Sequence, residues 1–161
     1  MVTLSVKKDT ICNGLNINVK LTTPNTPTRE ARFRYVSIVP AGVIVAPVSG
    51  SDITPNTVLT NTLVNSNNSP QLVRFVVTPY TRQASGNLEK CTGINDTIYI
   101  WLEPSVKLAA FISDTVYCNN SSISISLSTP TSATGGVVYD LTSTPSASAV
   151  SGYSPTLQGK Q

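Results

Sequence analysis

Several short segments of the chain alternate apolar and polar residues with a period of two. Val73, Phe75 and Val77 would point to one side of such a segment, and Arg74 and Val76 to the other. This alternation is typical of β-strands that are buried on one face. The segments with this alternation, or with a composition that favours strands, are residues 15–21, 31–39, 43–48, 60–64, 72–78, 98–102 and 123–127.

Turn-forming residues such as Asn13-Gly14 separate these segments, and no window has a clear helical period. Roughly seven short strands at this spacing predict an all-β fold, a two-sheet antiparallel sandwich. Its interior is expected to hold one side of the strands. These predicted core residues are Leu15, Ile17, Val19, Leu21, Phe33, Tyr35, Val73, Phe75, Val77, Ile98, Ile100 and Leu102.

The sequence contains an internal repeat. Residues 9–13 (Asp-Thr-Ile-Cys-Asn) reappear, with one insertion, as residues 114–119 (Asp-Thr-Val-Tyr-Cys-Asn), and aligning Cys12 with Cys118 gives an offset of 106 residues (118 minus 12). The same offset aligns Ile17, Val19, Leu21, Phe33 and Tyr35 with Ile123, Ile125, Leu127, Tyr139 and Leu141. We therefore expect a tandem repeat, with a complete unit at residues 1–108 and the N-terminal half of a second, truncated unit at residues 109–161.

Composition argues against catalysis. The 161 residues include no His, which excludes Ser-His-Asp and Cys-His sites and deprives a zinc site of a usual ligand. The eight carboxylates are scattered, without the spacing of a calcium loop. We therefore predict no enzyme activity and no catalytic, cofactor-binding or metal-binding residues. Calcium held at the junction of two units by Asp9 or Asp114 with Glu103 is the alternative.

Charge and hydropathy narrow the range of partners. The net charge of +3 is small and dispersed, which argues against nucleic acid. No apolar run approaches the about 20 residues of a membrane span, so membrane insertion is not expected.

The cysteines suggest a disulfide within the first unit. Cys12 precedes the second strand and Cys91 the last, so the two could be joined in an oxidising compartment. The counterpart of Cys91 in the second unit would fall beyond Gln161, which leaves Cys118 without a partner. The alternative is three reduced, buried cysteines in a cytosolic protein.

Several motifs occur in a characteristic order: residues 10–14 (Thr-Ile-Cys-Asn-Gly), 59–65 (Leu-Thr-Asn-Thr-Leu-Val-Asn), 69–79, and Cys91-Thr92-Gly93 before residues 96–104. Together they resemble the PKD-like (polycystic-kidney-disease-like) repeats of large Bacteroidota cell-surface adhesins, over nearly all of the first unit and again from Asp114. The resemblance implies tandem Ig-like sandwiches, export by type IX secretion and an extracellular, cell-surface location. It also implies a non-enzymatic spacer in adhesion or gliding motility, with neighbouring repeats of the same chain as partners.

One face of the predicted sheet is a candidate ligand site. If residues 31–39, 72–78 and 98–102 are neighbouring strands, their outward side chains include Arg32, Arg34, Arg74, Tyr99 and Trp101. Tyr99 and Trp101 stand where PKD-like repeats usually have Thr. Arginines beside aromatic rings can bind sugars through stacking and charged hydrogen bonds. The alternative function is therefore a carbohydrate-binding module of a secreted polysaccharide-degrading protein. On the plainer interpretation these side chains cover a solvent-facing sheet or contact the next repeat.

The tripeptide Asp-Thr-(Ile/Val) occurs at residues 9–11, 96–98 and 114–116. It resembles the acceptor of Bacteroidota O-glycosylation, which implies glycans on Thr10, Thr97 and Thr115. Alternatively, these Asp and Thr side chains satisfy backbone groups where strands begin.

Overall fold

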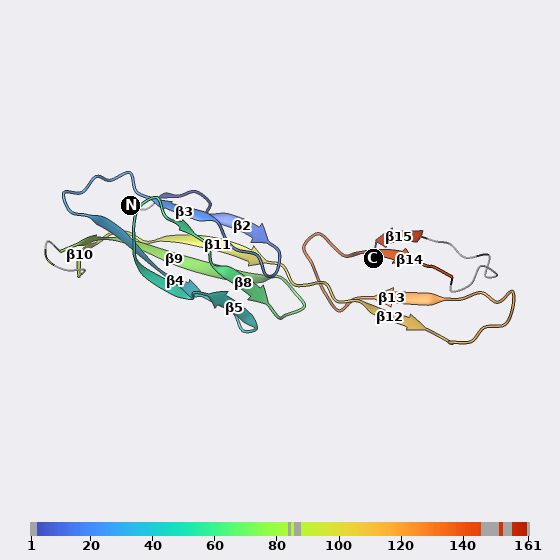
Figure 1. Ribbon diagram of the computed structural model, residues 1–161. Coiled ribbons are helices and arrows are strands. Elements are labelled where there is room, and N and C mark those ends of the chain that lie inside the picture. Colours follow the sequence, from blue (N-terminus) through green and yellow to red (C-terminus); the bar gives the residue numbers. More distant parts are fainter. Residues whose placement is uncertain (1–2, 84, 86–87, 146–151, 153–155, 161) are drawn as a thin grey trace. The chain divides into compact units, whose positions relative to one another are not determined.

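The computed structural model describes residues 3–83, 85, 88–145, 152 and 156–160 (Figure 1). The chain divides into two compact units, Met1–Ser105 (unit 1) and Val106–Gln161 (unit 2). Every regular element among the described residues is a β-strand, so the all-β fold class is confirmed. None of these residues forms a helix that could serve as a membrane span.

A large sheet forms one layer of unit 1, with the strand order β2-β11-β9-β4-β6 and with β10 also paired to β9. These strands are β2 (Lys8–Ile11), β4 (Ala31–Ile38), β6 (Ser49–Ile53), β9 (Gln71–Arg82), β10 (Glu89–Thr92) and β11 (Asp96–Leu102). All pairs are antiparallel except β2 with β11, which run parallel from Tyr99↔Lys8 to Leu102↔Ile11.

The second layer of unit 1 contains five shorter strands: β1 (Thr3–Leu4), β3 (Val19–Thr22), β5 (Val43–Ala46), β7 (Val58–Leu59) and β8 (Thr62–Asn65). β3 lies between β1 and β7, and β5 pairs with β8. Two backbone hydrogen bonds, from Ile17 to Asn61 (3.0 Å) and from Leu63 to Leu15 (3.2 Å), link the two groups of strands.

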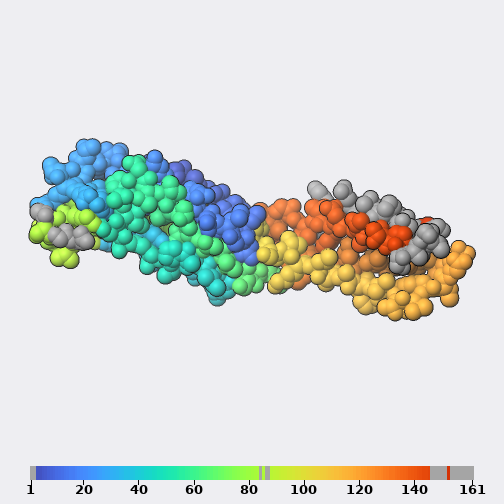
Figure 2. Space-filling view, in the orientation of Figure 1, coloured from blue at the N-terminus to red at the C-terminus, as the bar shows by residue number. Residues whose placement is uncertain are grey.

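The apolar sides of both layers meet in one hydrophobic cluster, which is consistent with the predicted β-sandwich. In Figure 2, the residues of unit 1 (blue to yellow) form one closely packed body. Every predicted core residue except Leu15 is buried. Each such side chain contributes roughly 1.5–3 kcal/mol before the loss of conformational entropy is subtracted.

The prediction for Leu15 is wrong, because 54% of its surface is exposed. Leu15 directly follows the turn at Gly14, where φ is 81°, and it precedes β3 instead of belonging to it. The alternating pattern therefore extends two positions beyond the part of the segment that the opposite layer covers.

The strands described in unit 2 form two separate two-stranded sheets. β12 (Ala109–Ile112) pairs with β13 (Ile125–Ser128), and β14 (Val138–Thr142) pairs with β15 (Thr156–Lys160). Thr131 and Val137 are buried, whereas most of the large apolar side chains described in this unit are exposed.

Candidate functional site on the outer face of the large sheet

The strand order β11-β9-β4 confirms that the three segments predicted to carry the ligand site are neighbours. Cross-strand register places Tyr99 beside Arg74 and Arg74 beside Ile38, and it places Trp101 beside Leu72. Tyr99 is 38% exposed and Trp101 is 47% exposed, so both aromatic side chains lie on the outer face as predicted.

Arg32 does not belong to an open ligand site. It is only 8% exposed and lies in a charged cluster with Glu30, Asp52 and Arg82. Its Nε atom lies 3.3 Å from Asp52 Oδ1, and its Nη2 contacts Glu30. Both arginines therefore use the same two carboxylates, and the cluster is neutral overall.

Arg82 completes this cluster from β9. Its Nε donates to Asp52 Oδ1 at 2.8 Å, and its Nη1 lies 3.2 Å from Glu30 Oε2. The hydrogen bond to Asp52, together with the charges of Asp52 and Glu30, raises the pKa of Arg82 above its ordinary value. The guanidinium thus stays charged, and the cluster ties β9 to β6.

Arg34 is also occupied within the fold. Its guanidinium forms an ion pair with Glu89 of β10 and lies 5.8 Å from the centre of the Tyr80 ring. Of the five residues predicted for the ligand site, the structure therefore brings together Arg74, Tyr99 and Trp101, and it places Arg32 and Arg34 in ion pairs toward the opposite end of the sheet.

We define the aromatic patch as Lys8, Leu72, Arg74, Tyr99 and Trp101. A shallow groove is lined by Lys8, Leu72, Tyr99 and Trp101, and Arg74 lies next to Tyr99 on the neighbouring strand. Neither Lys8 nor Arg74 forms an ion pair with any residue that the structure describes. The patch therefore combines stacking surfaces with two cations that are open to a ligand.

Sequence reasoning missed Lys8 and Leu72 in this patch, and Glu30, Asp52 and Glu89 as partners of the arginines. Leu72 lies two positions before Arg74 on β9, so the alternation along this strand predicts that both side chains point outward. No comparable signal exists for Lys8, which reaches the patch only because β2 pairs with β11.

The structure contradicts the predicted disulfide between Cys12 and Cys91. Both thiols are free and exposed, as is Cys118. Cys91 pairs with Thr81 on β9, whereas Cys12 directly follows Ile11, which aligns through Leu102 with Gln71. Ten residues of an extended strand span about 30 Å, and a disulfide requires Cα atoms within about 7 Å.

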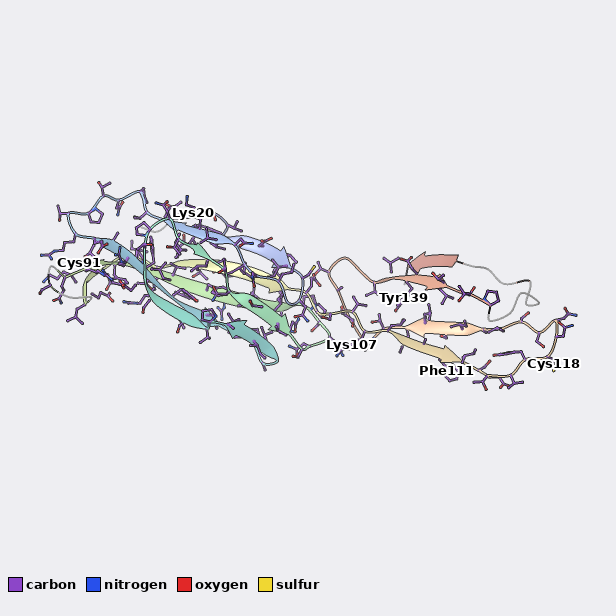
Figure 3. All side chains as sticks on the ribbon, in the orientation of Figure 1. Lys20, Cys91, Lys107, Phe111, Cys118 and Tyr139 are labelled. Atoms are coloured by element: carbon purple, nitrogen blue, oxygen red, sulfur yellow. The ribbon has the colours of Figure 1, made fainter. Side chains whose placement is uncertain are left out.

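The alternative prediction, three buried cysteines, is also wrong, because all three are exposed. Figure 3 labels Cys91, which belongs to β10 in unit 1, and Cys118, which lies in the segment between β12 and β13.

The three Asp-Thr-(Ile/Val) motifs share one local geometry. In each, the Thr amide donates to the Oδ1 atom of the preceding Asp, at 2.8 Å for Thr10, 2.9 Å for Thr97 and 2.7 Å for Thr115. This is the backbone role considered as the alternative to glycosylation. Thr10 and Thr115 are exposed and Thr97 is half-buried, and glycosylation of all three stays a prediction.

Carboxylates and cysteines do not gather into a metal-binding group among the described residues, where no three of them lie close enough together to hold an ion. This includes Asp9, Asp114 and Glu103, the residues of the calcium alternative.

No protein-family model matches the sequence, and no curated protein matches it either. Among solved structures, the crystal structure of the E. coli chaperone DraB is similar, with a TM-score of 0.42 and 9% sequence identity. The match covers 65% of this chain and 55% of that one, so the chain spans little more than half of the chaperone's length. A likeness at this level carries no argument about fold or function.

The free thiols lead to a first prediction. Iodoacetamide added to the native chain without a reductant should modify all three cysteines, because each is exposed. Intact mass spectrometry counts the added groups, and Cys12→Ser serves as the control that should take up two. If the chain takes up one group before reduction and three afterwards, the prediction is contradicted and a disulfide between Cys12 and Cys91 is supported.

Proposed function

We propose that this chain is a non-enzymatic spacer segment of a repetitive extracellular adhesin. In this proposal its Ig-like, PKD-like repeats are exported by type IX secretion and hold an adhesive or motility element away from the cell surface. Residues 1–108 are then one complete repeat, and residues 109–161 are the N-terminal half of the next.

The parallel pairing of β2 with β11 is the observation that carries this proposal. β2 is one of the first strands of unit 1 and β11 is its last strand, and the two run in the same direction. The chain therefore comes into unit 1 at one end of the large sheet and leaves it at the other. A unit of this kind adds its length to an extended array, whereas a unit with both termini at one end would not.

Polar contacts fasten the point at which the chain leaves unit 1. Asn65 is buried and donates through Nδ2 to the carbonyl oxygen of Leu102 at 3.0 Å. Asn13 donates through Nδ2 to Ser105 Oγ at 2.7 Å and to the carbonyl oxygen of Asn65 at 3.1 Å. These bonds hold the C-terminal segment of unit 1 against the loop that follows β2.

A spacer must also resist tension, and the geometry favours this. Tension between the two ends of unit 1 acts along β2 and β11, so their hydrogen bonds are loaded in shear and must break together. The bonds at the two ends of this pairing run from Tyr99 N to Lys7 O (2.8 Å) and from Glu103 N to Ile11 O (2.9 Å). Between them, the parallel register places the Asp9 amide opposite the carbonyl of Tyr99.

Strand pairing in unit 2 supports the tandem-repeat part of the proposal. The register of β12 with β13 equals that of β1 with β3 after a shift of 106 residues, and one pair in β14–β15 is related in the same way to β4–β6. The related pairs are Leu4↔Leu21 with Ala110↔Leu127, and Phe33↔Ile53 with Tyr139↔Gly159.

The spacer proposal predicts high mechanical strength in unit 1. In single-molecule stretching of the full chain through its termini, unit 1 should unfold in one step with a length gain of at most about 380 Å. Asp9→Pro should lower the force of that step, because it removes a donor from the β2–β11 pairing and costs about 1–3 kcal/mol.

Thr10→Pro is the matched control. The Thr10 amide donates to the Asp9 side chain and so makes no bond to β11, and proline is tolerated on an edge strand at such a position. Equal weakening by both prolines, or a unit 1 that unfolds at very low force, would contradict the proposal.

As a second candidate function, we propose that unit 1 is a carbohydrate-binding module whose aromatic patch binds an acidic polysaccharide. The observation that favours it is the position of Arg74 and Lys8, which have no described ion-pair partner, beside the exposed rings of Tyr99 and Trp101. Sugar rings can stack on the aromatic side chains while carboxylates meet the two cations.

This candidate predicts that polygalacturonate retards the chain in affinity electrophoresis, and that neutral dextran has less effect. Trp101→Ala and Arg74→Ala should each abolish the retardation, and added salt should weaken it. Val36→Ala changes an exposed residue of the same sheet outside the patch and should leave the mobility unchanged. A wild-type chain that both polymers leave unretarded would rule out this candidate while leaving the spacer proposal intact.

A further inference from the structure

Asn13-Gly14 is the one Asn-Gly dipeptide in the sequence, and it lies in the turn that follows β2. Asparagine before glycine is chemically labile in a flexible chain, because glycine has no side chain to hinder attack by its backbone nitrogen. This nitrogen bonds to the Cγ atom of asparagine and the Cγ–Nδ2 bond breaks. Ammonia leaves with the glycine amide proton, and water opens the resulting succinimide to aspartate or isoaspartate. The reaction therefore consumes only water.

The fold engages both reacting groups. The Gly14 amide donates to the carbonyl oxygen of Leu63 at 2.8 Å. Asn13 Oδ1 accepts from the Asn65 amide at 2.6 Å, and Asn13 Nδ2 donates to Ser105 Oγ at 2.7 Å and to the carbonyl oxygen of Asn65 at 3.1 Å. Attack on Cγ requires the Gly14 nitrogen to leave Leu63 and the Asn13 side chain to rotate. The folded unit therefore hinders a reaction that its sequence favours.

The hydrogen bonds of Asn13 extend to the C-terminal segment of unit 1 (residues 102–105). Ser105 in this segment accepts from Asn13 directly. Asn65, which is buried, bonds to Asn13 through its backbone and donates through Nδ2 to the carbonyl oxygen of Leu102 at 3.0 Å. Detachment of the segment thus removes one partner of Asn13 and loosens the other.

We propose that Asn13 is a deamidation site, and that the C-terminal segment of unit 1 controls its reaction. Asn13 is preserved while the segment is bound and reacts when the segment detaches. The carboxylate that is formed accepts hydrogen bonds but donates none, so the carbonyl oxygen of Asn65 loses its donor. The segment is then held less firmly. Because the ammonia is lost, the change persists as a chemical record of the opening.

This inference goes beyond both proposed functions and depends on neither, because it needs only hydrogen bonds within unit 1. The stretching experiment tests the pairing of β2 with β11, and the electrophoresis experiment tests the aromatic patch. The deamidation proposal can therefore fail while either function stands, and the reverse also holds.

The test follows the modification in the full chain, incubated in mildly alkaline buffer with and without urea. Mass spectrometry of the tryptic peptide of residues 9–20 measures conversion at Asn13. Conversion should be at least about tenfold slower without urea, because the fold must first open locally. Ser105→Ala should raise this native rate at least about twofold, because it removes one acceptor of Asn13 Nδ2. Ser66→Ala is the matched control, an exposed serine next to Asn65, and should convert like the wild type.

The effect of the product is tested with Asn13→Asp. The Glu103 amide donates to the carbonyl oxygen of Ile11 at 2.9 Å, close to the turn. Its hydrogen exchange should become at least about threefold faster, because the two bonds that Asn13 donates are lost. Asn16→Asp is the matched control. It adds the same charge three residues later and keeps the bond that this side chain accepts from Thr62 Oγ1, so exchange at Glu103 should not change.

Two results would overturn the control by the C-terminal segment: equal conversion with and without urea, or a Ser105→Ala chain that converts no faster than the wild type. Equal exchange at Glu103 in the Asn13→Asp and Asn16→Asp chains would overturn the lasting effect of the modification.

Discussion

The burial of alternate side chains between two layers of strands is the constraint on which the structure depends. In unit 1 the inner residues of β3, β4, β9 and β11 share one cluster. In unit 2 the same kind of sequence forms strands in nearly the same register, but most of its described large apolar side chains remain exposed. The difference between the units therefore lies in the strands that cover the inner face, because the local pattern of the sequence is shared.

Much of the fold could be predicted because alternation with period two is a local property. The strands around Phe75, Ile100 and Val19 and the identity of nearly the whole core follow from parity alone. The alternation does not show where the opposite layer of strands ends. For this reason it wrongly predicts that Leu15 is buried. The cysteine pairing failed for a related reason, since proximity to a strand in sequence does not reveal at which end of the sheet a residue lies.

The candidate site shows the same division between local and long-range information. Alternation placed Tyr99 and Trp101 outward, and it also placed Arg32 and Arg34 on the outer face. It contained nothing about Asp52 and Glu89, which come from other strands and neutralise these arginines. Which cations stay open to a ligand is therefore decided by cross-strand register, and this leaves the aromatic patch with Arg74 and Lys8.

The central claim is that the opposing layer stabilises the strands of a unit. Native-state hydrogen exchange of the full chain tests it most directly, by comparing the β3 amides that face β1 with the β13 amides that face β12, because these two strand pairs have aligned sequences and the same register. The account predicts that Thr22 exchanges at least about 100-fold more slowly than Ser128, because only the strand that the opposing layer covers requires global unfolding to open. Equal protection of the two amides would contradict it.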